Sequence, residues 1–299
     1  MQYDIVVLTD NALLALDEQD WYSRQVHLED GLVVTALQQH GLKVGRKDWA
    51  EPGYDWSQCR AAVFRTTWDY FHRFDESAPW LARVGHSTRL FNEAALIHWN
   101  LDKHYLADLQ QAGINTVPTC YIEVGDRRTL SQVIADSGWH DVILKPVISG
   151  AARHTYRLQA DGAAALECTF AELIQQEALM LQPFQHDILN QGELSLMVID
   201  GHYTHAIRKT AKAGDFRVQD DHGGTVHRYD ASAEEIRFAE AAVAAVPFDV
   251  LYARVDMVRD NRGQLAIMEL EMIEPELFFR FQAEAANKLA AGIVRRLQA

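Results

Sequence analysis

The stretch that decides the fold is Tyr252–Glu271, which reads YARVDMVRDNRGQLAIMELE. Its centre, Asp260–Gly263, has the composition of a tight turn, so the residues on either side are predicted to form two antiparallel strands. Side chains at positions i and i+2 share one face of a strand, and pairing about this turn brings Asp256 close to Glu269. The pattern therefore predicts a hairpin that gathers charged side chains on one face.

Three carboxylates share that face with one arginine: Asp256, Glu269 and Glu271 lie beside Arg254. Carboxylates this close repel one another unless a cation lies between them. Hard oxygen ligands suit Mg²⁺, which proteins usually bind through one or two carboxylates together with substrate phosphates. A solvated acidic sheet face is the alternative interpretation, and spacing alone favours neither. The same alternation predicts Ile267 on the carboxylate face.

Length, composition and charge exclude several classes of protein. The chain has 299 residues, of which 48% are hydrophobic and 23% are charged, as in a folded protein of two or three packed units. Its formal net charge of -14 argues against a nucleic-acid partner, because an acidic surface repels phosphate backbones. The cysteines form neither a disulfide framework nor a zinc motif, and no apolar run reaches the roughly 20 residues of a membrane span. The sequence thus predicts a cytoplasmic protein with no membrane partner.

Hydrophobic periodicity predicts two kinds of architecture along the chain. Strands and helices alternate over the first hundred residues, beginning with the apolar run at Tyr3–Thr9, and this alternation indicates an open α/β unit. One continuous helix is predicted over Asn100–Ala112, ended by Gly113. Strands dominate the rest of the chain, and Asp200–Gly201 marks a hairpin turn. The second part is therefore predicted to be an α+β unit built on antiparallel hairpins.

A lysine at a strand end forms a second candidate site. Lys145 closes the predicted strand Asp141–Lys145, and a loop of small residues that includes Ser149 and Gly150 follows it. An ammonium group beside accessible backbone N–H groups could hold a phosphate. The alternative is a surface lysine followed by a turn, and the pattern GxxxxGK[ST] of a P-loop is absent. This motif decides nothing by itself.

A basic island in the acidic chain forms a third candidate site. Lys209, Lys212 and Arg217 lie close together in sequence, and the glycine pair Gly223-Gly224 follows them. Such a loop could hold a carboxylate or a phosphate, whereas the alternative is a solvated, flexible loop. The residues predicted to contact substrate here are Lys209, Arg217, Gly223 and Gly224.

A fourth candidate site follows the predicted strand Ala61–Arg65. Ligands of open α/β sheets bind beyond the carboxyl ends of the strands, which is where Arg65, Trp68 and Asp69 are expected. An arginine and an aspartate beside a tryptophan would suit a zwitterionic substrate that resembles an amino acid. The alternative is a capped loop around a buried tryptophan. The three residues are therefore candidate substrate contacts.

The order of these motifs resembles that of the ATP-grasp superfamily of ligases. The similarity covers essentially the whole chain, lies near bacterial glutathione synthetase and D-alanine–D-alanine ligase, and is most specific over Arg254–Glu271. Phrases such as Asn100–Leu106, Gly192–Ser195 and Tyr252–Asp256 resemble a narrower group that includes the cyclo-ligase of D-cycloserine biosynthesis. The resemblance implies an ATP-grasp fold preceded by a Rossmann-like pre-ATP-grasp domain. The implied domains are residues 1–98, 99–185 and 186–299.

The resemblance also implies which residues bind the nucleotide. Two lysines would hold the phosphates and the adenine edge, and a mobile loop would cover the phosphates. A hinge segment would meet adenine through its backbone, and an acidic residue would bind ribose. The nucleotide-binding residues implied in this way are Lys103, Lys145, Ser149, Gly150, Gln182, Pro183, Phe184 and Glu193.

The resemblance also implies catalytic and metal-binding roles for the residues of the hairpin. By resemblance, Arg254 is the catalytic arginine that steadies a tetrahedral intermediate, and Asp256, Glu269 and Glu271 bind Mg²⁺ or Mn²⁺. The superfamily usually has Asn at the position of Glu271, so this chain carries one more negative charge there. That charge could tighten metal binding, or Glu271 could bind through a single oxygen.

The function implied by the resemblance is that of an ATP-dependent, ADP-forming ligase. It would activate a carboxylate as an acyl phosphate and join it to an amine or another nucleophile. The nucleophile could belong to a second molecule or to the same amino-acid derivative, as in the formation of a cycloserine ring. The cofactors would be ATP and Mg²⁺ or Mn²⁺, the substrate an amino-acid-like carboxylate, and the chain could form a homodimer. A non-catalytic or regulatory ATP-binding protein is the alternative, which Arg254 disfavours because binding alone does not require that arginine.

Overall fold

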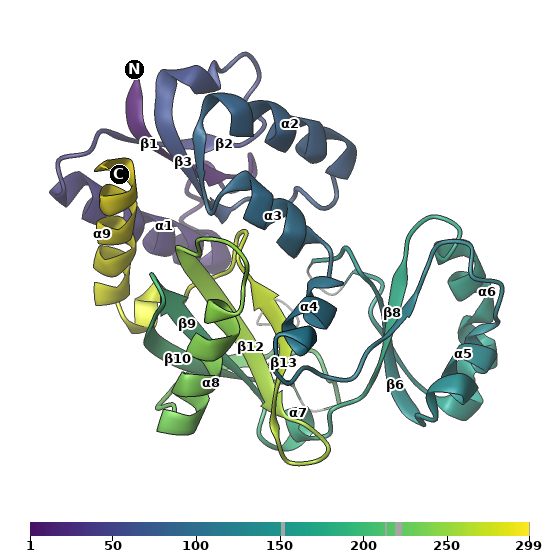
Figure 1. The fold of residues 1–299 in the computed structure, drawn as a ribbon. Coiled ribbons are helices and arrows are strands. Elements are labelled where there is room, and N and C mark those ends of the chain that lie inside the picture. The colour runs from purple at the N-terminus through teal and green to yellow at the C-terminus, as the bar shows by residue number, and fades with distance from the viewer. Residues whose placement is uncertain (151–152, 213, 219–222, 299) are drawn as a thin grey trace.

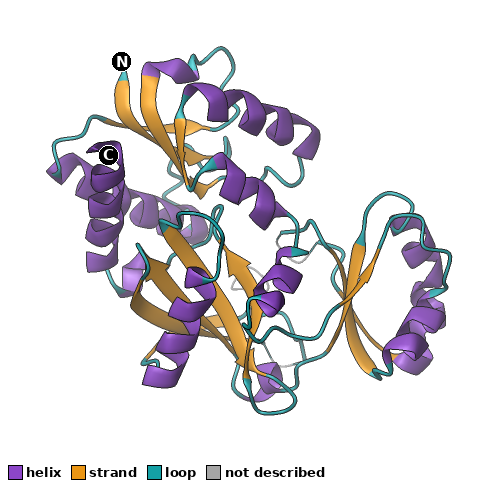
Figure 2. Cartoon of the chain, viewed as in Figure 1, coloured by secondary structure: helices purple, strands orange, loops and turns teal. Residues whose placement is uncertain are grey.

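The computed structural model describes residues 1–150, 153–212, 214–218 and 223–298. Its strands form three separate sheets, with helices packed on them (Figure 1 and Figure 2). The first hundred residues build a parallel sheet, the middle of the chain a small antiparallel sheet, and the second half a larger antiparallel sheet. The predicted combination of α/β and α+β architecture is confirmed.

The first sheet has the strand order β2-β1-β3-β4, and all its strands are parallel. Its strand β1 carries an unbroken apolar run because both faces of the sheet are covered. Ile5 and Val7 contact one hydrophobic core, whereas Val6 and Leu8 contact another. The elements are β1 (Tyr3–Thr9), α1 (Trp21–Gln39), β2 (Val44–Asp48), β3 (Cys59–Thr66), α2 (Phe74–Ser87), β4 (Arg89–Phe91) and α3 (Ala94–Leu101).

The helix predicted over Asn100–Ala112 is in fact two helices, α3 and α4 (Tyr105–Gln111). Between them the Lys103 N–H donates to the Val147 carbonyl at 3.0 Å, a long-range bond that replaces a helical one. The prediction of one helix is wrong because this tertiary contact overrides the local periodicity. The break turns the Lys103 side chain toward the second and third sheets.

The second sheet is small, antiparallel and ordered β5-β8-β6-β7. Two helices cover one of its faces, at the right of Figure 1. The first of them begins with a capping box, in which Thr129 accepts from the Gln132 N–H and Gln132 accepts from the Thr129 N–H. The elements are β5 (Cys120–Ile122), α5 (Leu130–Ser137), β6 (Asp141–Pro146), β7 (Tyr156–Gln159), α6 (Ala163–Leu173) and β8 (Leu179–Pro183).

The third sheet is antiparallel and ordered β11-β10-β9-β12-β13. On one face, Leu194, Leu196 and Val198 of β9 pack against α4 and α8 in a shared core. The opposite face carries Glu193 and Ser195 and looks toward the cavities described below. The elements are α7 (Asp187–Asn190), β9 (Glu193–Ile199), β10 (His202–Thr210), β11 (Thr225–Tyr229), α8 (Ala233–Ala244), β12 (Tyr252–Arg259), β13 (Leu265–Glu271) and α9 (Glu284–Gln298).

β13 contains one residue more than the partner strand requires, which changes the face on which Ile267 lies. Asp256 pairs with Glu269, as predicted, but the next residue, Met257, pairs with Ile267. Met268 is therefore the extra residue of a β-bulge. Ile267 is fully buried in the core beneath the sheet, whereas Met268 lines a cavity. The prediction that Ile267 shares the carboxylate face is wrong.

Polar side chains fasten the first sheet to the third. The Tyr252 hydroxyl lies 2.7 Å from the Ile273 carbonyl, 3.0 Å from the Phe91 carbonyl and 3.2 Å from the Phe64 carbonyl. The Asn92 amide donates to the Tyr252 carbonyl at 3.0 Å. All these groups are buried, so leaving any of them unpaired would be costly. These hydrogen bonds therefore fix the position of the loops of the first sheet relative to the third sheet.

His205 in β10 makes stability depend on pH. Its Nε2 lies 2.8 Å from the Leu277 carbonyl, which can only accept, so Nε2 donates and Nδ1 accepts from the Thr204 hydroxyl at 2.9 Å. Burial lowers the pKa of His205 to about 4. The unfolded chain, with a histidine pKa of about 6.5, therefore binds the proton first, and stability falls as the pH drops from about 6.5 to about 4.

We expect the free energy of unfolding to fall by about 2 kcal/mol between pH 7 and pH 5 through His205 alone. Urea unfolding at a series of pH values measures this loss. His205→Gln should be less stable at neutral pH but should show a flatter profile over this interval. The matched control His202→Gln, at an exposed position of the same strand, should keep the parent profile. Parallel profiles for the parent and His205→Gln would exclude His205 as the source.

Candidate functional site

Two adjoining cavities lie where the three sheets meet. The narrow cavity, of about 160 Å³, lies between the second and third sheets. The wide cavity, of about 420 Å³, lies between the third sheet and the loops of the first. A shared set of side chains and backbone lines both cavities, so the two adjoin. The shared residues are Lys103, Ser149, Gly150, Glu193, Glu269 and Glu271.

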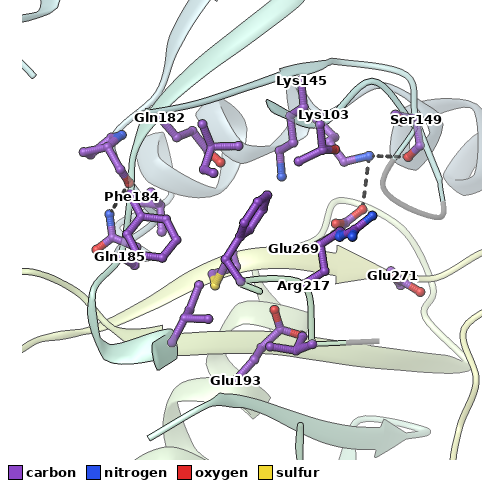
Figure 3. Close-up of a pocket in the computed structure, with 18 of the residues that line it drawn as sticks. Lys103, Lys145, Ser149, Gln182, Phe184, Gln185, Glu193, Arg217, Glu269 and Glu271 are labelled. Atoms are coloured by element: carbon purple, nitrogen blue, oxygen red, sulfur yellow. Dashed lines mark hydrogen bonds and ion pairs between the residues drawn. The ribbon is translucent and has the colours of Figure 1, made fainter. Parts of the chain in front are cut away.

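Two lysines project into the narrow cavity from the side opposite the acidic sheet face (Figure 3). The Lys103 ammonium donates to the Ser149 carbonyl at 2.6 Å and lies 3.1 Å from a Glu269 carboxylate oxygen. Lys145 comes from β6 and points toward the same space. Burial lowers the pKa of Lys145, an effect that Glu269 opposes and Lys103 reinforces. The two ammonium groups are donors of the kind that a polyphosphate accepts from.

The other end of the narrow cavity is apolar and suits a flat ring. The Phe184 ring is buried there, and the Arg157 guanidinium lies 3.5 Å from its centre. Gln182 borders the same end, but its amide is turned toward the Thr119 hydroxyl at 2.9 Å. Sequence reasoning missed most of this lining, because isolated apolar residues carry no motif. The apolar lining residues are Val117, Ile143, Ile188, Phe216, Val218 and Met268.

The hinge segment between β8 and α7 also borders this end, but its carbonyl groups already have hydrogen-bond partners. The Gln185 amide donates to the Pro183 carbonyl at 2.6 Å. The Phe184 carbonyl accepts from the Asn261 amide at 2.9 Å. A ring bound here and carrying a hydrogen-bond donor would therefore compete with the Gln185 side chain for the Pro183 carbonyl.

A buried charge network centred on Asp256 occupies the sheet face. The Asp256 carboxylate accepts from Arg254 at 2.8 Å, from Lys209 at 3.3 Å and also from the Ser195 hydroxyl. Lys209 donates in addition to Glu193 at 2.8 Å. Burial alone would raise the pKa of Asp256, but Arg254 and Lys209 hold it below its usual range. The predicted ribose acid Glu193 and the predicted substrate contact Lys209 thus pair with each other.

Glu269 and Glu271 extend this network toward the shared part of the cavities (Figure 3). Burial would raise the pKa of Glu269, but Lys103 and Lys145 hold it below its usual range. Glu271 contacts the Arg254 guanidinium. Burial nevertheless raises the pKa of Glu271 to about 7. The four carboxylates of the network and the junction therefore face four cationic side chains, so their formal charges balance.

The three predicted metal ligands differ in how well they fit a divalent cation. The side chains of Glu269 and Glu271 each keep 30% exposure and offer hard oxygen atoms to the junction. Asp256 keeps only 4% and already accepts hydrogen bonds on both oxygens. Within the described part of the chain, no three His, Cys, Asp or Glu side chains lie close enough to hold a metal together. Glu269 and Glu271 would hold Mg²⁺, and Asp256 would join them only if Arg254 moved away.

The loop that follows β6 touches the first sheet's loop at the cavity junction. The Ser149 carbonyl accepts from Lys103, and the Ser149 hydroxyl donates to the Arg153 carbonyl at 3.0 Å. Gly150 lies against the Phe71 ring so closely that a Cβ atom there would come within 2.8 Å of it. The contact requires glycine at this position because any side chain would displace the ring.

Arg65, Trp68 and Asp69 are not brought together as predicted. Arg65 is 1% exposed and donates to the Pro275 carbonyl at 3.0 Å, so direct contact with a substrate is not open to it. Asp69 accepts from the Trp49 indole at 2.6 Å. Only Trp68 lines the wide cavity. The prediction placed these residues correctly beyond the strand end, but the chain turns there and directs two of the three side chains elsewhere.

The predicted basic loop is divided between different places. Lys209 belongs to the buried network, whereas Arg217 lines the narrow cavity and pairs with Asp215 at 2.7 Å. Gly223 and Gly224 lie directly before β11, and Gly223 has a φ of 82°, which favours glycine. The loop thus borders the narrow cavity rather than forming one anion site.

Sequence reasoning missed several residues of the wide cavity. Asp10 and Tyr22 come from the first sheet and its helix, and Tyr70 follows Trp68 in the loop after β3. Glu274 is the third residue after β13 and lines the same cavity. The one available signal was the position of Asp10, which comes directly after the carboxyl end of a parallel strand.

Comparison with known proteins places this arrangement in a family. Residues 5–92 match the model of the D-cycloserine synthetase DcsG N-terminal domain, and residues 105–291 match that of the RimK-like ATP-grasp domain. The cycloserine biosynthesis protein DcsG of Streptomyces lavendulae is 30% identical over 284 residues, which cover 89% of this chain and 93% of that protein. These matches confirm the resemblance expected from the sequence.

Solved structures agree with the sequence matches. The crystal structure of D-cycloserine synthetase DcsG superposes with a TM-score of 0.83 at 28% identity and covers 98% of this chain and 99% of that chain. D-alanine–D-alanine ligase from Bacillus anthracis has the same fold, with a TM-score of 0.68 at 15% identity over 98% of this chain and 97% of that one. The chain therefore belongs to the RimK-like ATP-grasp family and is an ADP-forming carboxylate ligase.

Proposed function

We propose that the narrow cavity binds ATP and that the wide cavity binds the carboxylate that ATP activates. The observation that carries this proposal is the junction, where Lys103, Glu269 and Glu271 line both cavities. Lys145 lines the narrow cavity beside them, and Arg254 lines the wide one. A γ-phosphate held by Lys103 and Lys145 would end at this junction. A carboxylate in the wide cavity would meet it from the side of Arg254.

The chemistry proceeds in two displacements. A substrate carboxylate oxygen attacks the γ-phosphorus of ATP, a new P–O bond forms, and the bond to ADP breaks. The nucleophile then attacks the carbonyl carbon of the acyl phosphate, phosphate leaves, and the nucleophile gives up its proton. Arg254, which lines the wide cavity, would stabilise the negative charge on the oxygen of the tetrahedral intermediate. Bound Mg²⁺ would supply charge neutralisation at the phosphates, held by Glu269 and Glu271.

The acceptor is the finer part of the proposal. The similarity to cycloserine biosynthesis protein DcsG over most of both chains favours a nucleophile within the substrate itself, so that ligation closes a ring. A match to a probable α-L-glutamate ligase of Parasynechococcus marenigrum (strain WH8102) covers only 75 residues at 37% identity. Because this match is so short, it is weaker support for an acceptor in a second molecule than the DcsG match is for one within the substrate. The substrate we propose is an amino-acid-like carboxylate rather than a nucleic acid or a membrane component.

Location and assembly belong to the same proposal. All three cysteines are unpaired, which favours the reducing cytoplasm where ATP is also available. Of the helices that the structure describes, none combines the length and apolarity needed to cross a bilayer. We propose a cytoplasmic enzyme that could act as a homodimer, which light scattering in solution would test.

Incubation with ATP, Mg²⁺, hydroxylamine and a panel of small carboxylates tests the proposed reaction. Hydroxylamine traps an acyl phosphate as a hydroxamate, so ADP and hydroxamate should appear in equal amounts. Without hydroxylamine, a ring-closing substrate should give a product lighter by one water. Release of AMP and pyrophosphate would contradict activation through an acyl phosphate. A product that contains two substrate molecules would contradict ring closure.

Lys145→Ala should weaken ATP binding at least about tenfold, because a charge-assisted hydrogen bond contributes about 1.5–3 kcal/mol. Isothermal titration calorimetry with ATP and Mg²⁺ measures the loss. Lys212→Ala is the matched control, because it removes an exposed lysine from the loop after β10. Equal, small losses in both variants would mean that Lys145 does not hold a phosphate.

Glu269→Gln should remove most of the Mg²⁺-dependent part of the thermal stabilisation by ADP, since it deletes one ligand charge. The Tm is measured with ADP alone and with ADP and Mg²⁺. Glu123→Gln, which neutralises an exposed glutamate outside the cavities, should keep the full Mg²⁺ effect. A full Mg²⁺ effect in Glu269→Gln would remove this residue from the metal site.

A further inference from the structure

The segment that follows β13 forms part of the wall of the wide cavity. Glu274 and Glu276 of this segment line the cavity together with Tyr22, Trp68 and Tyr70. The aromatic rings come from the first sheet's helix and loop, whereas the two glutamates come from the third sheet. We call residues 274–276 the strap.

Each carbonyl group of the strap is held by a different side chain. Trp68 donates to the Glu274 carbonyl at 2.9 Å, and Arg65 donates to the Pro275 carbonyl at 3.0 Å. Arg254 approaches the Glu276 carbonyl at 3.4 Å. Arg65 and Trp68 thus act on the cavity through the backbone of the strap. Because Arg65 and Trp68 lie at the end of β3, they fix the position of the strap backbone and so of the Glu274 and Glu276 side chains.

Glu274 differs from the other glutamates of this cavity in its partners. Glu269, Glu271 and Glu276 each lie within ion-pair distance of a lysine or arginine. Among the ion pairs of the described residues none includes Glu274, whose side chain meets the Tyr70 hydroxyl instead. A partly buried carboxylate without a cationic partner is costly to ionise. A bound ligand with a positive charge would supply the missing partner.

Asp10 is the competing carboxylate in this part of the cavity. It also lacks a lysine or arginine partner among the described ion pairs, but it accepts from the Leu13 N–H at 2.9 Å and so shapes the loop after β1. Among the described hydrogen bonds, none joins the Glu274 side chain to the backbone of a neighbouring loop. The two acids can therefore be separated by substitution.

We propose that Glu274 selects substrates that carry an amino group, and that Trp68 and Arg65 are positioning residues that hold the strap for it. The inference rests on the proposed function, since it places the substrate carboxylate at Arg254 and the cavity junction. The substrate's ammonium group then donates to Glu274 beside the Tyr70 hydroxyl. The wide cavity thus offers Arg254 to the carboxylate at one end and Glu274 to the ammonium group at the other, which fits an amino carboxylate.

The test uses matched pairs of small acids that differ only in an amino or a hydroxyl group. Alanine and lactate of both hands, and β-alanine with 3-hydroxypropionate, are assayed by hydroxamate formation and by NMR binding experiments in the presence of ADP and Mg²⁺. The parent should favour the amino member of a pair. Glu274→Gln should raise KM for that member about tenfold or more and leave the hydroxy member and the ATP KM unchanged.

Two further variants separate the roles. Asp10→Asn should retain the preference for amino acids. Trp68→Phe removes the donor to the strap but keeps an aromatic wall, and it should reduce the preference for the amino member of each pair. A thermal melt confirms that each variant is folded.

The outcomes distinguish the inference from the proposed function. Binding of amino acids that depends on Glu274, without ADP or hydroxamate, would reject the proposed reaction and keep the inference. Equal use of amino and hydroxy acids, or loss of preference in Asp10→Asn but not in Glu274→Gln, would overturn the inference alone. If no amino acid of the panel binds or reacts, the inference is rejected.

Discussion

The ion pair between Asp256 and Arg254 is the constraint on which the rest of the site depends. A buried carboxylate is stable only when paired and hydrogen-bonded, and Asp256 obtains this from Arg254, Lys209 and Ser195 together. The same arginine contacts Glu271 and the carbonyl of Glu276. The Arg254 guanidinium therefore bonds to groups of the sheet face, the cavity junction and the strap. Any cation that binds at the junction has to share the carboxylates with this guanidinium.

The hairpin and its carboxylates could be predicted because they depend on local rules. Turn composition and the two-residue period of a strand were enough to pair Asp256 with Glu269. The period could not reveal that β13 has one residue too many, since a bulge is recognised only against the partner strand. As a result, Ile267 was placed on the wrong face, and Met268 was missed as a wall of the narrow cavity.

Long-range contacts explain the other differences. The apolar spacing of residues 100–112 is compatible with one helix, and only the Val147 carbonyl, far along the chain, draws Lys103 out of it. Arg65 lies at the expected end of its strand, but its partner is a carbonyl 210 residues away. Sequence position thus located these residues within the fold, whereas the direction of each side chain depends on segments that no local pattern describes.

The core beside the first sheet has a consequence for the order in which the protein can fold. Ile5, Val7 and Val63 of the parallel strands pack in one cluster with Phe279 and Leu289, near the other end of the sequence. The early helix α1 packs in the same cluster, but synthesis releases the sheet and α1 long before α9. The part of the cluster that α9 covers therefore stays exposed on the ribosome while the intervening sheets emerge. Contacts between residues this distant in sequence form slowly, and the intermediates that precede them expose apolar surface that is prone to aggregate. A nascent chain of this enzyme is therefore a natural client for chaperones that shield apolar surfaces.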